Sequence, residues 1–170
     1  MSSVAHTRIY LVGFMGSGKS SVGRLLARKL GWKFVDLDRE IEHHEKQTIA
    51  EIFQASGESR FRELEREHLS RLSLGRQVVI ALGGGAFIDD SNREVANASG
   101  LTIWLKVSFA TVVSRVKMDG SRPKFASPEQ AETLYKSRES VYRQARLHVE
   151  ADDRSPALVV EELLGVIRNL

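Results

Sequence analysis

Short apolar runs alternate along the chain with segments in which apolar residues recur at helical spacing. The runs have the length and composition of strands, and they occupy residues 9–12, 33–37, 78–82, 102–107 and 147–150. Helical patterns lie between and after them, for example at Val22, Leu25, Leu26 and Leu30. This alternation predicts an α/β fold, in which a central parallel five-stranded sheet carries helices on both faces and binds ligands at the carboxyl ends of its strands.

Two segments depart from the alternation. Residues 38–76 have helical patterns throughout, including a charged helix from about residue 58 to 73, and are longer than a simple crossover needs. We expect this segment to form a lobe over the edge of the sheet. Residues 117–128 contain glycine, two prolines and serines between two helical patterns, and they predict a mobile loop.

The first strand leads into a glycine-rich motif. Residues 13–20 read Gly-Phe-Met-Gly-Ser-Gly-Lys-Ser and precede a helix, so backbone N–H groups and the helix N-terminus converge on one point. In such a phosphate loop Lys19 supplies a cation for the outer phosphates, and the Ser20 hydroxyl can ligate Mg²⁺. A glycine-rich turn without a ligand is the alternative, but motif and context together favour nucleotide binding.

Two carboxylates, Asp36 and Asp38, end the second strand. If the extended conformation continues, both side chains point toward the phosphate loop. One can then organise hydrated Mg²⁺ while the other accepts a proton from a substrate hydroxyl. Asp38 could instead cap the helix that begins near Arg39. Because the third strand has no terminal acid, Asp36 is the natural carboxylate for the metal.

Further candidates are glycines and arginines. The three glycines at residues 83–85 follow the third strand, and they either let a ligand approach bare backbone or form a flexible turn. Arg62, Arg122 and Arg138 have planar guanidinium groups that suit carboxylates and phosphates, although each alone could be an ordinary surface residue. Arg122, in the expected mobile loop, is best placed to close over a phosphoryl group.

Composition limits the classes of function. The 170 residues suit one domain, and the net charge of +3 comes from 25 basic and 22 acidic residues that are interleaved. Because no basic stripe with aromatic residues is present, we expect no nucleic-acid partner. The chain has no cysteine and no apolar run of roughly 18 residues. We therefore expect a cytoplasmic protein without a membrane partner, and a monomer.

The ordered series of motifs resembles the shikimate kinase family over nearly the whole chain. Residues 11–20 resemble the family's phosphate loop, including its methionine, and residues 36–38 resemble its Asp-x-Asp. Residues 57–62 resemble its Gly-Glu-x-x-Phe-Arg, and they are followed by Glu65, the three glycines, Arg122-Pro123, and Arg138 with Tyr142. The resemblance implies a P-loop kinase fold, with a small substrate-binding lobe at about residues 38–76 and a mobile lid at about residues 115–128.

The resemblance also implies an activity, namely transfer of the ATP γ-phosphate to the 3-hydroxyl of shikimate on the route to chorismate and aromatic amino acids. Asp38 would bind and deprotonate this hydroxyl, and Lys19 and Arg122 would stabilise the phosphoryl group. Ser20 would ligate Mg²⁺ directly, with Asp36 reaching it through water. The shikimate carboxylate would be bound by Arg62 and Arg138, in a pocket shaped by Gly83, Gly84 and Gly85.

The implied ATP site extends beyond the phosphate loop. Its residues would be Gly13, Met15, Gly16, Ser17, Gly18, Lys19, Ser20, Ser21, Arg115, Arg122 and Pro156. Arg115 and Pro156 match positions at which the family sandwiches adenine. From the residues alone, Pro156 could merely begin the last helix, and Arg115 could merely be solvated.

Two stretches depart from the family pattern. Lys124 and Phe125 stand where leucines usually follow the lid arginine and proline, which could alter lid closure. Residues 139–141, Glu-Ser-Val, stand where a proline is usual, which could shift Arg138. A kinase for another small polyol or sugar acid, such as gluconate, is the nearest rival, and the combination of Arg62 with three glycines disfavours it. The other rival is a nucleotide-dependent binding module, in which Asp38 would have no purpose.

Overall fold

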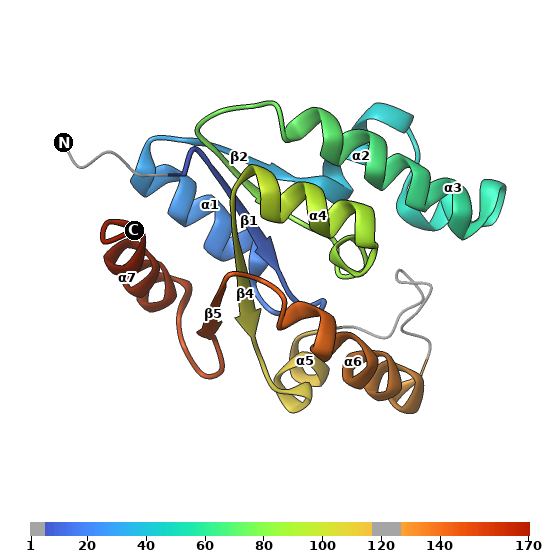
Figure 1. Ribbon diagram of the computed structural model, residues 1–170. Coiled ribbons are helices and arrows are strands. Elements are labelled where there is room, and N and C mark those ends of the chain that lie inside the picture. The colour runs from blue at the N-terminus through green and yellow to red at the C-terminus, as the bar shows by residue number, and fades with distance from the viewer. Residues whose placement is uncertain (1–5, 117–126) are drawn as a thin grey trace.

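The computed structural model describes residues 6–116 and 127–170, and these residues form one parallel β-sheet covered by helices (Figure 1). The strands follow the order β2-β3-β1-β4-β5 across the sheet, and every neighbouring pair is parallel. Their bounds are β1 (Arg8–Val12), β2 (Lys33–Asp36), β3 (Val78–Ala81), β4 (Leu101–Lys106) and β5 (Leu147–Glu150). The five predicted strands are therefore confirmed to within about one residue at each end.

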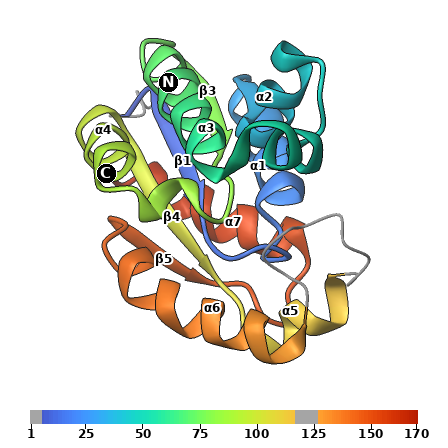
Figure 2. The ribbon, with the colours of Figure 1, turned by 90° about the vertical axis from the view of Figure 1, so that its right-hand side faces the viewer.

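The helices alternate with the strands as the pattern predicted. Helices α1 and α7 pack together on one face of the sheet, and α4 lies on the other face with α3 beside it (Figures 1 and 2). The helical elements are α1 (Lys19–Leu30), α2 (Leu37–Glu45), α3 (Ile49–Leu72), the short 3₁₀ helix η1 (Ala86–Ile88), α4 (Asp90–Ser99), α5 (Phe109–Arg115), α6 (Pro128–Tyr142) and α7 (Pro156–Ile167). This two-sided cover explains why β1, β3 and β4 are almost wholly buried and read as continuous apolar runs.

The register of the central strands aligns their carboxyl ends. Asp36, the last residue of β2, pairs with Ala81 of β3, and Ala81 pairs with Leu11 of β1. The segments that leave β2, β3 and β1 therefore start from one edge of the sheet. Those segments are the beginning of α2, the three glycines and the phosphate loop.

The helical segment expected between β2 and β3 consists of α2 and α3, which pack against each other. Thr48 begins α3 with a reciprocal cap: its hydroxyl accepts from the Glu51 N–H (3.2 Å), and its own N–H donates to the Glu51 carboxylate (2.6 Å). Gly57 interrupts α3 with a φ of 79°, a backbone conformation that favours glycine. The charged helix expected from about residue 58 is therefore the second part of α3.

The loop expected at residues 117–128 lies mostly outside the described residues. Its last two positions mark the start of a helix: the side chain of the capping residue Ser127 accepts from the Gln130 N–H (3.2 Å), and Pro128 is the first residue of α6. Among the described residues, no helix combines the length and the apolar character needed to cross a bilayer.

Candidate active site

The phosphate loop forms a compact turn between β1 and α1. Gly16 and Gly18 have φ values of 77° and 91°, which side chains other than glycine adopt only with strain, and Gly18 caps α1. The Lys19 ammonium donates to the carbonyls of Gly13 (2.8 Å) and Phe14 (2.9 Å) and so lies across the loop. The turn thus has the backbone conformation and the cation that phosphate binding requires.

An oxygen-donor pair lies beside this loop. The Ser20 hydroxyl, in the first turn of α1, donates to Oδ2 of Asp36 at the end of β2 (2.7 Å). Oxygen ligands of this kind suit Mg²⁺, which prefers few protein ligands next to substrate phosphates. The structure therefore brings together the two residues expected to serve the metal, and their donor types fit it.

The two carboxylates occupy different settings, which corrects two details of the sequence interpretation. The extended conformation does not continue to Asp38, because β2 ends at Asp36 and α2 begins at Leu37. Asp36 is the residue that caps α2, accepting from the Arg39 N–H (3.3 Å), so the alternative in which Asp38 caps the helix is wrong. Asp38 instead lies in the first turn of α2, where the N-terminal end of the helix favours its negative charge.

Each of the three glycines lies against a different charged side chain. A methyl group built on Gly83 would come within 2.5 Å of the Asp38 carboxylate, and one on Gly84 would come within 3.1 Å of the Arg138 guanidinium. One on Gly85 would come within 2.5 Å of the Arg62 guanidinium. A merely flexible turn would not require glycine at all three positions, so the contacts favour the reading in which bare backbone borders a site.

The arginine from α3 is held by a buried acid. Arg62 donates to the Glu65 carboxylate (2.5 Å), which is only 1% exposed, and it also contacts Glu58 (3.4 Å). Burial raises the pKa of Glu65 to about 7, although the Arg62 guanidinium opposes this rise. Sequence reasoning placed Glu65 in a motif without giving it a task. Its spacing of three residues from Arg62 on a helix is the signal that could have indicated the pair.

The other arginine, Arg138, comes from α6 and is 6% exposed. The Glu-Ser-Val stretch that follows it does not remove it from the three glycines, as the close approach of Gly84 shows. Glu139 of this stretch pairs with Arg143 one helical turn later (2.9 Å) rather than with Arg138. Although Glu-Ser-Val stands here in place of the usual proline, the Arg138 guanidinium still lies beside the three glycines.

A cleft of about 230 Å³ joins the phosphate loop to the two carboxylates. It is lined by Met15, Gly16, Gly18, Lys19, Ser20, Ser21, Asp36, Asp38, Ala81, Leu82, Gly83 and Gly84. Gly84 and Gly85 extend this border to Arg138 and Arg62. Most of the residues singled out from the sequence thus surround one space at the carboxyl edge of the sheet.

The remaining expected residues have different outcomes. Arg115 ends α5 and donates to the Gly16 carbonyl of the phosphate loop (3.1 Å), so it is not merely solvated. Pro156 is the first residue of α7, whose cap is the Ser155 hydroxyl, as the structural alternative predicted. Arg122, Lys124 and Phe125 lie outside the described residues.

A second group of metal-ligating residue types lies between α2 and α3. The ligand atoms of His44, Glu45 and His68 are within 4.8 Å of one another. Arg71 donates to Nδ1 of His68 (3.1 Å), and burial together with the Arg71 charge lowers the pKa of His68. The Nδ1 lone pair of His68 is thus occupied by the Arg71 guanidinium in this structure.

Comparison with known proteins agrees with this geometry. The family model for shikimate kinase matches residues 15–168. A shikimate kinase from a Sulfurihydrogenibium species is 44% identical over 95% of this chain and 98% of its own length, and one from Persephonella marina is 43% identical over 94% and 98%. A solved structure of shikimate kinase from Acinetobacter baumannii in complex with shikimate has a TM-score of 0.93 and 34% identity, covering 98% of this chain and 95% of that chain.

A more distantly similar structure is relevant to the alternative function of a sugar-acid kinase. A gluconokinase from Sinorhizobium meliloti has a TM-score of 0.60 and 20% identity, covering 96% of this chain and 92% of that chain, which shows a shared fold alone. The P-loop kinase architecture is thus common to both kinds of protein, whereas the family model and the relatives above 40% identity concern one of them. The chain with Asp38 and two arginines gathered around its three glycines therefore belongs to the shikimate kinase family.

Proposed function

We propose that this protein transfers the γ-phosphate of ATP to the 3-hydroxyl of shikimate, yielding ADP and shikimate 3-phosphate on the route to chorismate and aromatic amino acids. The observation that carries the proposal is the arrangement of the three glycines. They lie against one carboxylate, Asp38, and two guanidinium groups, Arg62 and Arg138, at the edge of the phosphate-loop cleft. A substrate with both a hydroxyl and a carboxylate matches this combination of charges.

The nucleotide side of the site rests on the phosphate loop. Backbone N–H groups of residues 13–20 and the start of α1 bind the phosphates, and Lys19 exchanges its carbonyl partners for the outer phosphates. Ser20 and Asp36 are the residues that would hold Mg²⁺, which, when bound, neutralises charge on the phosphates. Arg115 and Pro156 would border the adenine.

In the part of the site that would bind shikimate, the Asp38 carboxylate and the two arginines have different roles. Arg62 and Arg138 bind the shikimate carboxylate and so fix the orientation of the ring. Asp38 then accepts the proton of the 3-hydroxyl while the hydroxyl oxygen bonds to the γ-phosphorus, and the bond from that phosphorus to the bridging oxygen of ADP breaks. The buried Glu65 carboxylate accepts a hydrogen bond from the Arg62 guanidinium and holds it in place. In this proposal Arg122, from a lid at about residues 115–128, stabilises the transferring phosphoryl group.

We further propose that residues 1–170 act as a single domain and as a monomer in the cytoplasm, with residues 38–76 as the substrate-binding lobe. Its partners in this proposal are the small molecules ATP and shikimate, without nucleic acid or membrane. The interleaving of acidic and basic residues supports the absence of a nucleic-acid partner.

A panel of hydroxy acids in a coupled assay for ADP tests the proposal. The purified protein is given ATP, Mg²⁺ and either shikimate or gluconate, and Asp38→Asn serves as the matched variant because it keeps the size of the side chain. We expect turnover with shikimate, and a loss of about 10²- to 10⁴-fold in kcat for Asp38→Asn with only a modest loss of shikimate binding. Turnover with gluconate alone would overturn the substrate, and no turnover with any acid would favour a binding module.

A further inference from the structure

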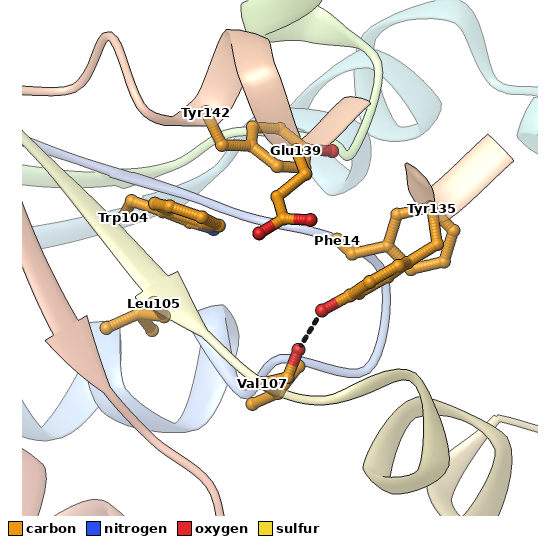
Figure 3. Close-up of a pocket in the computed structure, with 7 residues that line it drawn as sticks. All are labelled: Phe14, Trp104, Leu105, Val107, Tyr135, Glu139 and Tyr142. Carbon is orange, nitrogen blue, oxygen red and sulfur yellow. Dashed lines mark hydrogen bonds between the residues drawn. The ribbon is translucent and has the colours of Figure 1, made fainter. Parts of the chain in front are cut away.

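Tyr142 is a buried residue behind the site to which the proposed reaction gives no task. It is the last residue of α6 and is 2% exposed, and its hydroxyl donates to the carbonyl oxygen of Gly84. Its ring packs beside Trp104, with 6.1 Å between the ring centroids. Figure 3 shows Tyr142 and Trp104 on one side of a small aromatic pocket, with Tyr135 and Phe14 on the other.

The hydroxyl of Tyr142 remains a hydrogen-bond donor at neutral pH. Burial raises the pKa of Tyr142 to about 12, against the opposing effect of the neighbouring Arg138 guanidinium, which also interacts with the hydroxyl. The hydroxyl therefore meets two groups of the site, a carbonyl from the three glycines and a guanidinium one helical turn earlier on α6.

Gly84 is packed between these same groups. A methyl group on Gly84 would lie 3.1 Å from Arg138 Nη1, 3.7 Å from the Tyr142 hydroxyl and 3.6 Å from the Met15 nitrogen of the phosphate loop. Because the Gly84–Gly85 peptide is planar and trans, holding the Gly84 carbonyl toward Tyr142 turns the Gly85 N–H away from it. A glycine has no side chain to restrain this peptide, so the hydrogen bond from Tyr142 supplies the restraint.

We propose that Tyr142 is a positioning residue, whose hydroxyl fixes the three-glycine segment and the Arg138 guanidinium in the arrangement that binds the substrate carboxylate. The inference rests on the proposed function, because it assigns Tyr142 to carboxylate binding in the same site. Tyr142 acts through Arg138 and Gly84, and it lies behind them rather than in the cleft lining. Its loss therefore weakens the binding of shikimate more than it slows phosphoryl transfer.

Tyr142→Phe tests the inference, with Tyr135→Phe as the control. Both tyrosines are on α6, both border the pocket in Figure 3, and both donate to a backbone carbonyl, which for Tyr135 is that of Val107 (2.6 Å). Each variant removes one hydroxyl and keeps the ring. The hydroxyl of Tyr142, however, bonds to Gly84 and interacts with Arg138, whereas that of Tyr135 bonds to Val107.

Steady-state kinetics are measured well below the unfolding midpoint of each variant. We expect Tyr142→Phe to raise the KM for shikimate about tenfold, the loss equivalent to one hydrogen bond, with kcat and the KM for ATP within about threefold of the original values. Tyr135→Phe lowers the thermal midpoint without moving the KM for shikimate. In an Arg138→Ala background, Tyr142→Phe raises the KM for shikimate by a smaller factor than it does alone, because one of the two groups through which Tyr142 acts is gone.

The failures of the two proposals are distinguishable. If the unsubstituted protein turns over no shikimate, the proposed function falls, and this inference falls with it. If the unsubstituted protein turns over shikimate but Tyr142→Phe and Tyr135→Phe have the same KM, the positioning role alone is overturned. Full additivity of Tyr142→Phe with Arg138→Ala would likewise overturn it.

Discussion

Substitution of Gly83 by alanine is the sharpest test of the proposed base. The φ of Gly83 is outside the left-handed region, so alanine fits the backbone without strain. Its methyl group, however, would be 2.5 Å from Oδ1 of Asp38 and 3.2 Å from Cγ. Restoring the 3.4 Å of ordinary contact moves the carboxylate by about 0.9 Å. The variant thus displaces Asp38 without changing it.

The expected kinetic effect follows from this displacement. A misplacement of about 1 Å can cost on the order of 10²-fold in rate, so we expect kcat with shikimate to fall about 100-fold in Gly83→Ala. The KM for ATP stays within about twofold, because the three atoms nearest to the new methyl group all belong to Asp38 and none to the phosphate loop. The coupled ADP assay measures both quantities.

Gly165→Ala is the matched control. Gly165 lies inside α7, and a methyl group there would meet nothing within 4 Å. This variant should therefore gain about 0.5–1 kcal/mol of stability, because alanine favours helix, and keep its kcat. If Gly83→Ala retained a kcat within about threefold of the original, the carboxylate would not need its present position, and the assignment of Asp38 as the base would be refuted.

Three further predictions concern the arginine, its buried partner and the metal. Arg62→Ala, made in a Glu65→Gln background so that no buried carboxylate is stranded, should raise the shikimate concentration at half-saturation about 10- to 100-fold, and an unmoved value would make Arg62 an ordinary surface residue. Because burial raises the pKa of Glu65 from 4.5 to about 7, the native state keeps a proton that the unfolded chain has released, so this group's contribution to the free energy of unfolding falls as the pH rises from about 4.5 to about 7. Urea denaturation at pH 5 and pH 8 should show a smaller loss of stability for Glu65→Gln than for the unsubstituted protein, and equal losses would contradict the raised pKa. Asp36→Asn should raise the Mg²⁺ concentration for half-maximal turnover about 10- to 100-fold, with saturating Mg²⁺ restoring part of kcat, whereas an unchanged Mg²⁺ titration would remove Asp36 from the metal site.

Much of the fold could be predicted from local patterns. The five strands and the helices between them follow from the spacing of apolar residues, because a strand buried on both faces is a short continuous apolar run. The phosphate loop could also be predicted from the sequence. Its positive φ values at Gly16 and Gly18, and the start of the helix at Lys19, are local features that depend on neighbouring residues only. The ordered motifs were enough to indicate the family.

Other features were decided by contacts between distant segments. The strand order β2-β3-β1-β4-β5 depends on which strands pair, and the apolar pattern of a strand does not identify its neighbour. The different settings of Asp36 and Asp38 depend on where α2 begins, which their spacing alone could not determine.

The role of the three glycines is the clearest example of a feature that the sequence alone could not determine. Their position after β3 left a flexible turn and a ligand border equally open, and only the folded chain brings Asp38, Arg138 and Arg62 against them from three different helices. By itself, the sequence determined the elements and the chemical groups, because periodicity and turn geometry are local. The tertiary structure alone decided which groups meet, because packing joins residues that are tens of positions apart, and their side chains acquire partners and shifted pKa values only after burial.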